Sequence, residues 1–470
     1  YHPDWTNEEL IIQFLGSADD IGALNPDHLN LLGTGRVNAY EFLTAENVTM
    51  PQLLKIELAS TGYADANGNQ INEPGETVFL NLEFRNFMPC VAVDDVTVTM
   101  TTEDPWVTIL EGNAITSIPA DGYFTVNDQL QFQVNEDASS HYVEFLVTFE
   151  SETTISWGLE HTVEVLVAPS GTYIFEGVPN GRDHSGSFIK EILDQFEIHN
   201  VYANTYPPTL LGFDHVFVSH GNFGETLSDG TMFTQEQALI IQEYLENGGN
   251  LFVDMGSMIG IMDYSGYTNT AAIKSLFGIQ SAAVNMVSNP LNSLEGVGGS
   301  IMEGIHFTGS TQTENWYVDD LTLTTALATF SESDYGIVSC TNDGESTFGH
   351  KTFYLCYSLA ELIDIDAVNS RNNLLLQVLD FFDMLPEGYI LAGFSADKTA
   401  GGAPLEVQFT NVSLSEEGYP ITSWAWDFNG DGVTDSSEEN PIWTFETGGS
   451  HSVTLVVTNE ATYDTLTKHD

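Results

Sequence analysis

Basic residues are scarce in this chain of 470 residues, which has 10 lysines and arginines against 68 aspartates and glutamates. The formal net charge of −58 repels the phosphates of nucleic acids and the head groups of anionic membranes. We therefore expect no nucleic-acid partner. Solvent cations, bound metal ions or a very salty medium must balance so acidic a surface, and adaptation to such a medium is the simplest interpretation.

Long apolar runs and cysteines are also rare. No stretch of 18 apolar residues occurs, so we expect no transmembrane helix. Residue 1 is Tyr and there is no signal peptide, so we expect a processed chain or a piece of a longer one. Cys90, Cys340 and Cys356 lie in separate apolar contexts without CxxC spacing, which argues against a zinc site. Cys340 and Cys356 could bridge in an oxidising compartment, although buried free thiols are the simpler expectation.

Residues 1–48 are predicted to form short helices, the first with Thr6 as N-cap and Glu9 completing a capping box. The stretches HPDWTNEEL and LLGTGRVNAYEFL resemble, in order and spacing, the C-terminal end of subtilisin-like serine protease domains. The resemblance implies that residues 1–48 are the last helices of such a domain. The catalytic Asp, His and Ser motifs of that family do not occur in this chain, so it lacks the catalytic triad.

Residues 51–168 contain runs such as TVFLNLEFRN and YVEFLVTFE, in which apolar and polar residues alternate. This period of two predicts strands, and the turn clusters between them favour an immunoglobulin-like β-sandwich. One turn, DANGNQINEPGE, fits the frame of a calcium loop, with oxygen-bearing side chains at positions 1, 3, 5 and 12: Asp65, Asn67, Asn69 and Glu76. Position 6, where such loops need glycine, is Gln70, so a plain turn of Asn and Gly is the alternative.

Residues 171–388 alternate buried strands with helices, which predicts an α/β domain with a doubly wound parallel sheet. The run from 213 to 256 resembles flavodoxin-like domains of the class I glutamine-amidotransferase type. His220 follows a buried strand, as the histidine of caspase-like proteases does. The resemblance implies a cysteine at the end of the next strand, where Gly256 and Ser257 stand instead. Because no Gly-x-Ser-x-Gly elbow surrounds Ser257, we expect a non-catalytic domain in which His220 and Ser257 mark a vestigial pocket.

Residues 391–470 carry the stretches ITSWAWDFNGDG, NPIWTF and GSHSVTLVVTN. They resemble a polycystic-kidney-disease-type (PKD) domain, a small β-sandwich. The matching residues are Trp426, Asp427, Phe428, Asp431, Gly432, Asn440, Pro441 and the run 453–459. Most tryptophans of this segment are expected in its core.

The stretch DFNGDGVTDSSE satisfies the whole pattern of a calcium loop. Carboxylate, amide and backbone oxygens suit this hard cation. The predicted ligands are Asp427, Asn429, Asp431, Val433 through its carbonyl, Asp435 and Glu438. A solvated acidic hairpin loop that binds nothing tightly is the alternative.

Together these features predict a non-catalytic downstream region of a secreted subtilisin-like serine endopeptidase, located outside the cell or at its surface. Its modules would be spacers stiffened by calcium, and would bind protein or polysaccharide substrates or cell-surface components. A structural or adhesive surface protein, such as a filament or surface-layer subunit that self-assembles, is the alternative. Sequence upstream of residue 1 would decide whether the parent is an enzyme.

Overall fold

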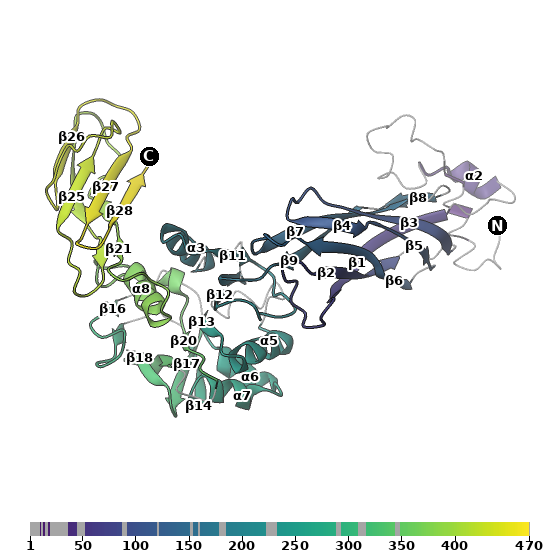
Figure 1. The fold of residues 1–470 in the computed structure, drawn as a ribbon, viewed down its shortest axis with the longest axis horizontal. Coiled ribbons are helices and arrows are strands. Elements are labelled where there is room, and N and C mark those ends of the chain that lie inside the picture. Colours follow the sequence, from purple (N-terminus) through teal and green to yellow (C-terminus); the bar gives the residue numbers. More distant parts are fainter. Residues whose placement is uncertain are drawn as a thin grey trace. The chain divides into compact units, whose positions relative to one another are not determined.

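The computed structural model describes residues 36–44, 52–86, 92–119, 122–150, 154–157, 160–177, 185–221, 233–287, 293–308, 316–343 and 348–469, with a few single positions between 10 and 18. The chain divides into two compact units, Tyr1–Ser170 with Pro207–Gly212 and Gly171–Tyr206 with Phe213–Asp470 (Figure 1). Of the predicted protease-derived helices, the structure describes α2 (Ala39–Thr44). The HPDWT motif and Cys90 lie outside the described residues.

The first unit contains a β-sandwich, as the alternating pattern predicted. Its strands are β1 (Gln52–Asp65), β2 (Thr77–Asn86), β3 (Val93–Thr101), β4 (Val107–Glu111), β5 (Asn113–Ile118), β6 (Gly122–Val134), β7 (His141–Glu150), β8 (Thr154–Trp157) and β9 (Glu160–Val167). They form two sheets, in the orders β4-β6-β2-β1-β8 and β5-β3-β7-β9. Strand β2 buries every second residue, including Leu80 and Phe84, in a core shared with β3, β6 and β7. The burial of these apolar faces is what holds the two sheets together.

The second unit is built on a nine-stranded sheet whose five parallel strands follow the order β11-β10-β12-β13-β20. These are β10 (Thr172–Glu176), β11 (Asn200–Ala203), β12 (His215–Gly221), β13 (Asn250–Met255) and β20 (Thr352–Leu355). Strands β10, β12, β13 and β20 are almost wholly buried, which explains their continuous apolar runs, whereas the edge strand β11 buries only Val201.

The same sheet continues through four antiparallel strands, which the sequence analysis did not predict. They are β19 (Gly336–Asn342), β18 (Leu327–Glu332), β15 (Leu294–Gly296) and β16 (His306–Phe307). Strands β18 and β19 are joined by residues 333–335 alone. So short a connection can only join antiparallel neighbours, since a parallel crossover needs a dozen residues or more. A separate ribbon pairs β14 (Ile279–Val287) with β17 (Trp316–Leu323).

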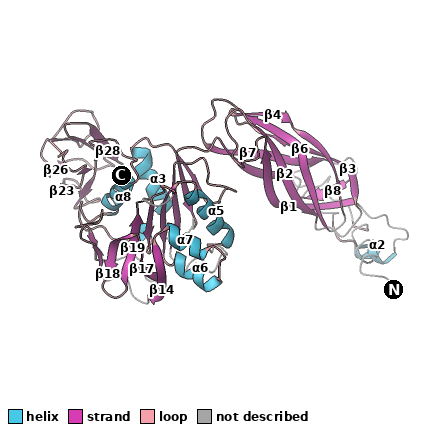
Figure 2. Cartoon of the chain, turned by 60° about the horizontal axis from the view of Figure 1, so that its bottom comes forward, coloured by secondary structure: helices cyan, strands magenta, loops and turns pink. Residues whose placement is uncertain are grey.

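The helices of this unit are α3 (Ser185–Gln195), α5 (Gln235–Glu246), α6 (Met258–Ser265), α7 (Thr270–Leu276) and α8 (Arg371–Phe381), with a short 3₁₀ helix η3 (Leu359–Glu361). Helix α3 packs on β10, β11 and β12, whereas α5, α6 and α7 lie together (Figure 2). Thr234 is the N-cap of α5, because its hydroxyl accepts the N–H of Gln237. No helix within the described ranges combines the length and apolar character needed to cross a bilayer.

The chain ends in a second, smaller β-sandwich. Its strands are β21 (Ile390–Leu391), β22 (Phe394–Ala396), β23 (Leu405–Asn411), β24 (Leu414–Ser415), β25 (Ser423–Asp427), β26 (Ile442–Phe445), β27 (Val453–Thr458) and β28 (Tyr463–Lys468). The sheets β22-β23-β26 and β25-β27-β28 enclose an aromatic core. Trp426 is fully buried there and stacks on Phe428, while Trp424 and Trp443 are half-buried at its edge.

Candidate binding sites at the acidic loops and the strand ends

Two acidic loops contain the predicted calcium ligands: the first acidic loop, residues 65–76, and the second acidic loop, residues 427–438. The second acidic loop begins at the last residue of β25 in the C-terminal sandwich. The Asp427 carboxylate accepts hydrogen bonds from the N–H groups of Asn429 (3.1 Å), Gly430 (2.7 Å) and Gly432 (2.8 Å). Partial burial raises the pKa of Asp427, but these backbone hydrogen bonds outweigh it and leave the pKa below its ordinary value. The side chain is therefore an anion held in place by the turn.

The other predicted ligands of this loop are arranged less uniformly. Oδ1 of Asn429 accepts the N–H of Asp431, and Oδ1 of Asp431 accepts the N–H of Val433. Oδ2 of Asp435 accepts the N–H of Phe428, so the loop backbone holds each of these side chains. Val433 is largely exposed, and the N–H of Glu438 donates to Ser436. The structure thus gathers the first half of the predicted ligand set around one turn.

The first acidic loop, residues 65–76 in the N-terminal sandwich, is likewise held by hydrogen bonds from backbone N–H groups to its polar side chains. Oδ2 of Asp65 accepts the N–H of Ile71 (3.2 Å), and Oδ1 of Asn67 accepts the N–H of Asn69 (2.9 Å). Glu76 closes the loop, since its carboxylate accepts the N–H groups of Asn67 and Glu73. Oδ1 of Asn69 also accepts the N–H of Ile71 (2.8 Å), so the side chains at positions 1, 3, 5 and 12 of the predicted frame all accept backbone N–H groups of this loop. Among the residues that the structure describes, no three acidic, histidine or cysteine side chains converge in the manner of a metal site.

His220 and Ser257, predicted to mark a vestigial pocket, are not linked by a hydrogen bond. The Ser257 hydroxyl donates to Oδ1 of Asp319 (2.7 Å), a buried carboxylate on β17. The His220 ring is buried against the rings of Phe175 and Phe233, and neither ring nitrogen has a hydrogen-bond partner in the described chain. Burial lowers the pKa of His220 to about 3, so the ring is neutral.

Two buried acids near the same strand ends were missed by the sequence analysis. Glu176 is the last residue of β10, and Asp254 is the fifth of six residues of β13. Both are completely buried. Their signal was present in the sequence, because TYIFE and NLFVDM each place one acid in an otherwise buried apolar strand.

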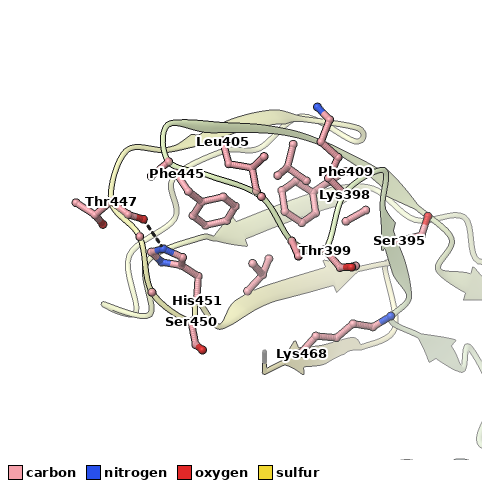
Figure 3. Close-up of a pocket in the computed structure, with 18 of the residues that line it drawn as sticks. Ser395, Lys398, Thr399, Leu405, Phe409, Phe445, Thr447, Ser450, His451 and Lys468 are labelled. Atoms are coloured by element: carbon pink, nitrogen blue, oxygen red, sulfur yellow. Dashed lines mark hydrogen bonds between the residues drawn. The ribbon is translucent and has the colours of Figure 1, made fainter.

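A cavity of about 520 Å³ opens at one end of the C-terminal sandwich (Figure 3). Phe394, Leu405 and Phe445 form apolar parts of the cavity wall. Lys398, Lys468 and His451 also line the cavity. The Lys468 ammonium donates to the carbonyl of Phe394 (2.8 Å), and His451 Nε2 lies 3.0 Å from the carbonyl oxygen of Thr447. Apolar walls next to basic groups can accept an apolar ligand that carries an acidic group.

Two matches above 30% identity concern this C-terminal sandwich. Residues 395–470 match the family model of the PKD domain. Residues 395–470 are a PKD domain. The solved PKD1 domain of Vibrio anguillarum Epp is 35% identical over 17% of this chain and 89% of that chain, with a TM-score of 0.15. The PKD1 domain from Vibrio cholerae metalloprotease PrtV is 38% identical over 17% of this chain and 93% of that chain, also with a TM-score of 0.15. No curated protein matches the chain.

The second acidic loop lies inside the PKD domain, and so do all the lining residues of the cavity except Phe394, which directly precedes the domain. PKD domains occur in secreted proteases and surface proteins, and they are compatible with a non-catalytic accessory region.

Proposed function

We propose that this chain is a non-catalytic accessory region of a secreted protein, in which folded modules hold a partner domain away from the cell surface and bind protein or polysaccharide. The PKD domain at residues 395–470 is the observation that carries this proposal. The acidic composition supports it too, since a net charge of −58 keeps an extracellular chain soluble and disfavours contact with anionic membranes.

The partner domain we propose is a subtilisin-like serine protease domain that precedes the β-sandwich. The two motifs within residues 1–48, in their order, support this parentage. For residues 171–388 we propose an amidotransferase-like domain without its nucleophile. The parallel strand order β11-β10-β12-β13-β20 supports this, because numbered along the chain it is 2-1-3-4-5, the flavodoxin-like order.

Calcium is the ion we propose for the two acidic loops. Their side-chain donors are carboxylate and amide oxygens, which this hard cation prefers. In each loop the side chain at position 3 accepts the N–H of position 5, over 2.9 Å in both cases. The oxygens at positions 1, 3 and 5 thus face one turn and keep lone pairs that the backbone does not use. A bound ion would offset the repulsion between neighbouring carboxylates and stiffen the connection between strands.

The ligand-binding part of the proposal can be tested with the full chain and four immobilised probes: casein, gelatin, cellulose and chitin. We expect retention on at least one probe without hydrolysis of casein. Thr399→Trp, which places an indole at the cavity of the PKD domain, should reduce retention at least tenfold, whereas Glu417→Trp at an exposed site should not. Retention on none of the probes would contradict the binding role.

Casein hydrolysis that is lost in His220→Ala would contradict the non-catalytic role. Ordered polymers of the purified chain seen by electron microscopy would instead favour the structural alternative, a filament or surface-layer subunit.

A further inference from the structure

Glu176, Ser219 and Asp254 form one row across three neighbouring strands of the large sheet. Glu176 on β10 is in register with Ser219 on β12, and Ser219 is in register with Asp254 on β13. In a parallel sheet, residues in register point to the same face, and neighbouring strands lie about 4.8 Å apart. The hydroxyl of Ser219 therefore stands between two carboxyl groups, and all three residues are completely buried.

Each acid uses one of its oxygens to hold a segment that covers the row. Oε2 of Glu176 accepts the N–H groups of Gly186 (2.8 Å) and Ser187 (3.3 Å), at the start of α3. Oδ2 of Asp254 accepts the N–H of Leu359 (2.9 Å), at the start of η3. The beginnings of α3 and η3 are therefore fastened to the strand ends through these two carboxyl groups.

The other oxygens of the row have no such partners. Oε1 of Glu176, Oγ of Ser219 and Oδ1 of Asp254 are buried and make no hydrogen bond of good geometry to a described residue. Beside the dominant effect of burial, which raises both pKa values, the Ser185 hydroxyl and the N–H of Leu359 lower the pKa of Asp254, and the N–H groups of Ser187 and Gly186 lower that of Glu176. The Ser219 hydroxyl makes a smaller lowering contribution to the pKa of both carboxyl groups. A hydroxyl has one hydrogen to donate, so it can satisfy one carboxylate and not two.

Among the residues that the structure describes, the charged groups on the surrounding elements do not neutralise the two acids. On α3, Lys190 pairs with Asp194. On α8, the Arg371 guanidinium lies over the Phe188 ring, pairs with Asp364 and donates to the carbonyl of Ala360. The remaining titratable groups on these elements and on β20 are Tyr173 on β10, Tyr202 on β11, Glu191 on α3, His215 and His220 on β12, Tyr354 on β20, Glu361 on η3 and Asp380 on α8. None of these described groups supplies a cation to the row, and residues 178–184 between β10 and α3 lie outside the described ranges.

We propose that Glu176, Ser219 and Asp254 share one proton at neutral pH, and that this proton keeps the starts of α3 and η3 closed over the strand ends. The protonated Glu176 carboxyl donates to the Ser219 hydroxyl, which donates to the Asp254 carboxylate. Every buried oxygen of the row then has a partner. Loss of the proton leaves two buried anions and one hydroxyl, and opening of α3 and η3 to water relieves their repulsion.

The direction of the pH dependence follows from the pKa values. Burial, followed by the charge of Asp254, raises the pKa of Glu176 from 4.5 to about 8, and burial raises the pKa of Asp254 from 3.8 to about 7. The open form has the ordinary, lower values and so binds fewer protons than the closed form. Closure is therefore strongest below pH 4 and weakens as the pH rises to about 8, above which it stays constant.

Hydrogen–deuterium exchange of the full chain tests the proposal at pH 6, 7, 8 and 9, after correction for the intrinsic exchange rate. Between pH 7 and pH 8 we expect the protection of peptides from 185–195 against exchange to fall. The fall should be about tenfold per pH unit for each proton that the row releases when it opens. Between pH 8 and pH 9 the protection should change little. Peptides from α5 provide an internal reference, because that helix does not touch the row.

In the Glu176→Gln variant, an amide N–H donor replaces the carboxyl proton and does not titrate. The α3 peptides of this variant should therefore stay protected, and their protection should not change between pH 7 and pH 8. Asp254→Asn serves as a second variant if the first does not fold. Glu191→Gln, an exposed acid on the same helix, should behave as the wild type. A wild-type profile that is flat, or one that Glu176→Gln leaves unchanged, would overturn the proposal.

The infrared spectrum separates a proton from a bound cation. At pH 7 we expect the carbonyl stretch of protonated carboxyl groups, and we expect the component that belongs to Glu176 to be missing from the spectrum of Glu176→Gln. Exchange at pH 9 is also compared in sodium and in N-methylglucamine at equal ionic strength. Stronger protection of α3 in sodium would show a cation in the row and would contradict a shared proton.

Discussion

Gln70 and Gly432 occupy the same position in two loops that belong to different domains. Each is the sixth residue counted from the Asp that begins its loop, and both have positive φ, 65° for Gln70 and 78° for Gly432. The fourth residues, Gly68 and Gly430, match as well, with φ of 77° and 72°. The two loops therefore share left-handed backbone at their fourth and sixth residues.

Because both residues have positive φ, substitution by alanine should affect stability differently at the two positions. Gly432→Ala should destabilise its loop by about 1 kcal/mol, because a Cβ is strained in the left-handed region although no neighbour lies in its way. Gln70→Ala should change stability by less than about 0.5 kcal/mol, since that strain is already present. Hydrogen exchange in urea, read on peptides of β25 and β1, measures both; equal effects would contradict the expectation.

Calcium should raise the thermal stability of the full chain if it binds the acidic loops. A hundredfold excess over the dissociation constant corresponds to about 2.7 kcal/mol. Asp65→Asn and Asp427→Asn should each remove part of this stabilisation and the double variant nearly all, whereas Glu417→Gln should keep it. Differential scanning calorimetry with calcium and with chelator provides the measurement, and an unchanged midpoint would remove calcium from the proposal.

The thiols of Cys340 and Cys356 should resist modification in the native protein. Both are free and buried, as the sequence analysis predicted. Burial raises the pKa of Cys340 to about 12 and also raises the pKa of Cys356, so the reactive thiolate is nearly absent at pH 8. In a Cys90→Ser variant, a thiol reagent should label the protein in denaturant and leave it unlabelled in native buffer. Rapid native labelling would mean that this part of the sheet opens readily.

Trp426 should be far more sensitive to substitution than Trp424. The Trp426 indole N–H donates to the carbonyl of Glu438 (2.9 Å), and its ring is fully buried. Trp426→Phe should therefore cost about 1–2 kcal/mol for the lost hydrogen bond, and Trp426→Ala about 3–5 kcal/mol.

Trp424 is the matched control, because its indole nitrogen has no partner among the described residues. Trp424→Phe should cost less than about 1 kcal/mol. Exchange protection of β27 in urea reports all three variants, and similar losses for Trp424→Phe and Trp426→Phe would show that the Glu438 contact contributes little.

The sequence by itself determined the local elements wherever one strong pattern governs a segment. Alternation in TVFLNLEFRN placed β2 with its apolar face inward, and the capping residues Thr234 and Gln237 fixed the start of α5. The PKD motif located the C-terminal sandwich, because its buried Trp426 and the tight turn after Asp427 demand particular residue types. In these cases the physical cause lies within a few residues of the chain.

Tertiary structure alone decided which distant residues meet. Ser257 stands where a nucleophile was sought, but its partner Asp319 comes from a ribbon 62 residues later. The row of Glu176, Ser219 and Asp254 exists because β10, β12 and β13 pair in one register, and nothing near each residue encodes that pairing. An acid in an apolar strand signals that burying its carboxyl group costs free energy. Only the packed sheet shows which other polar groups lie beside it, because desolvation and charge act between residues that are close in space and not in sequence.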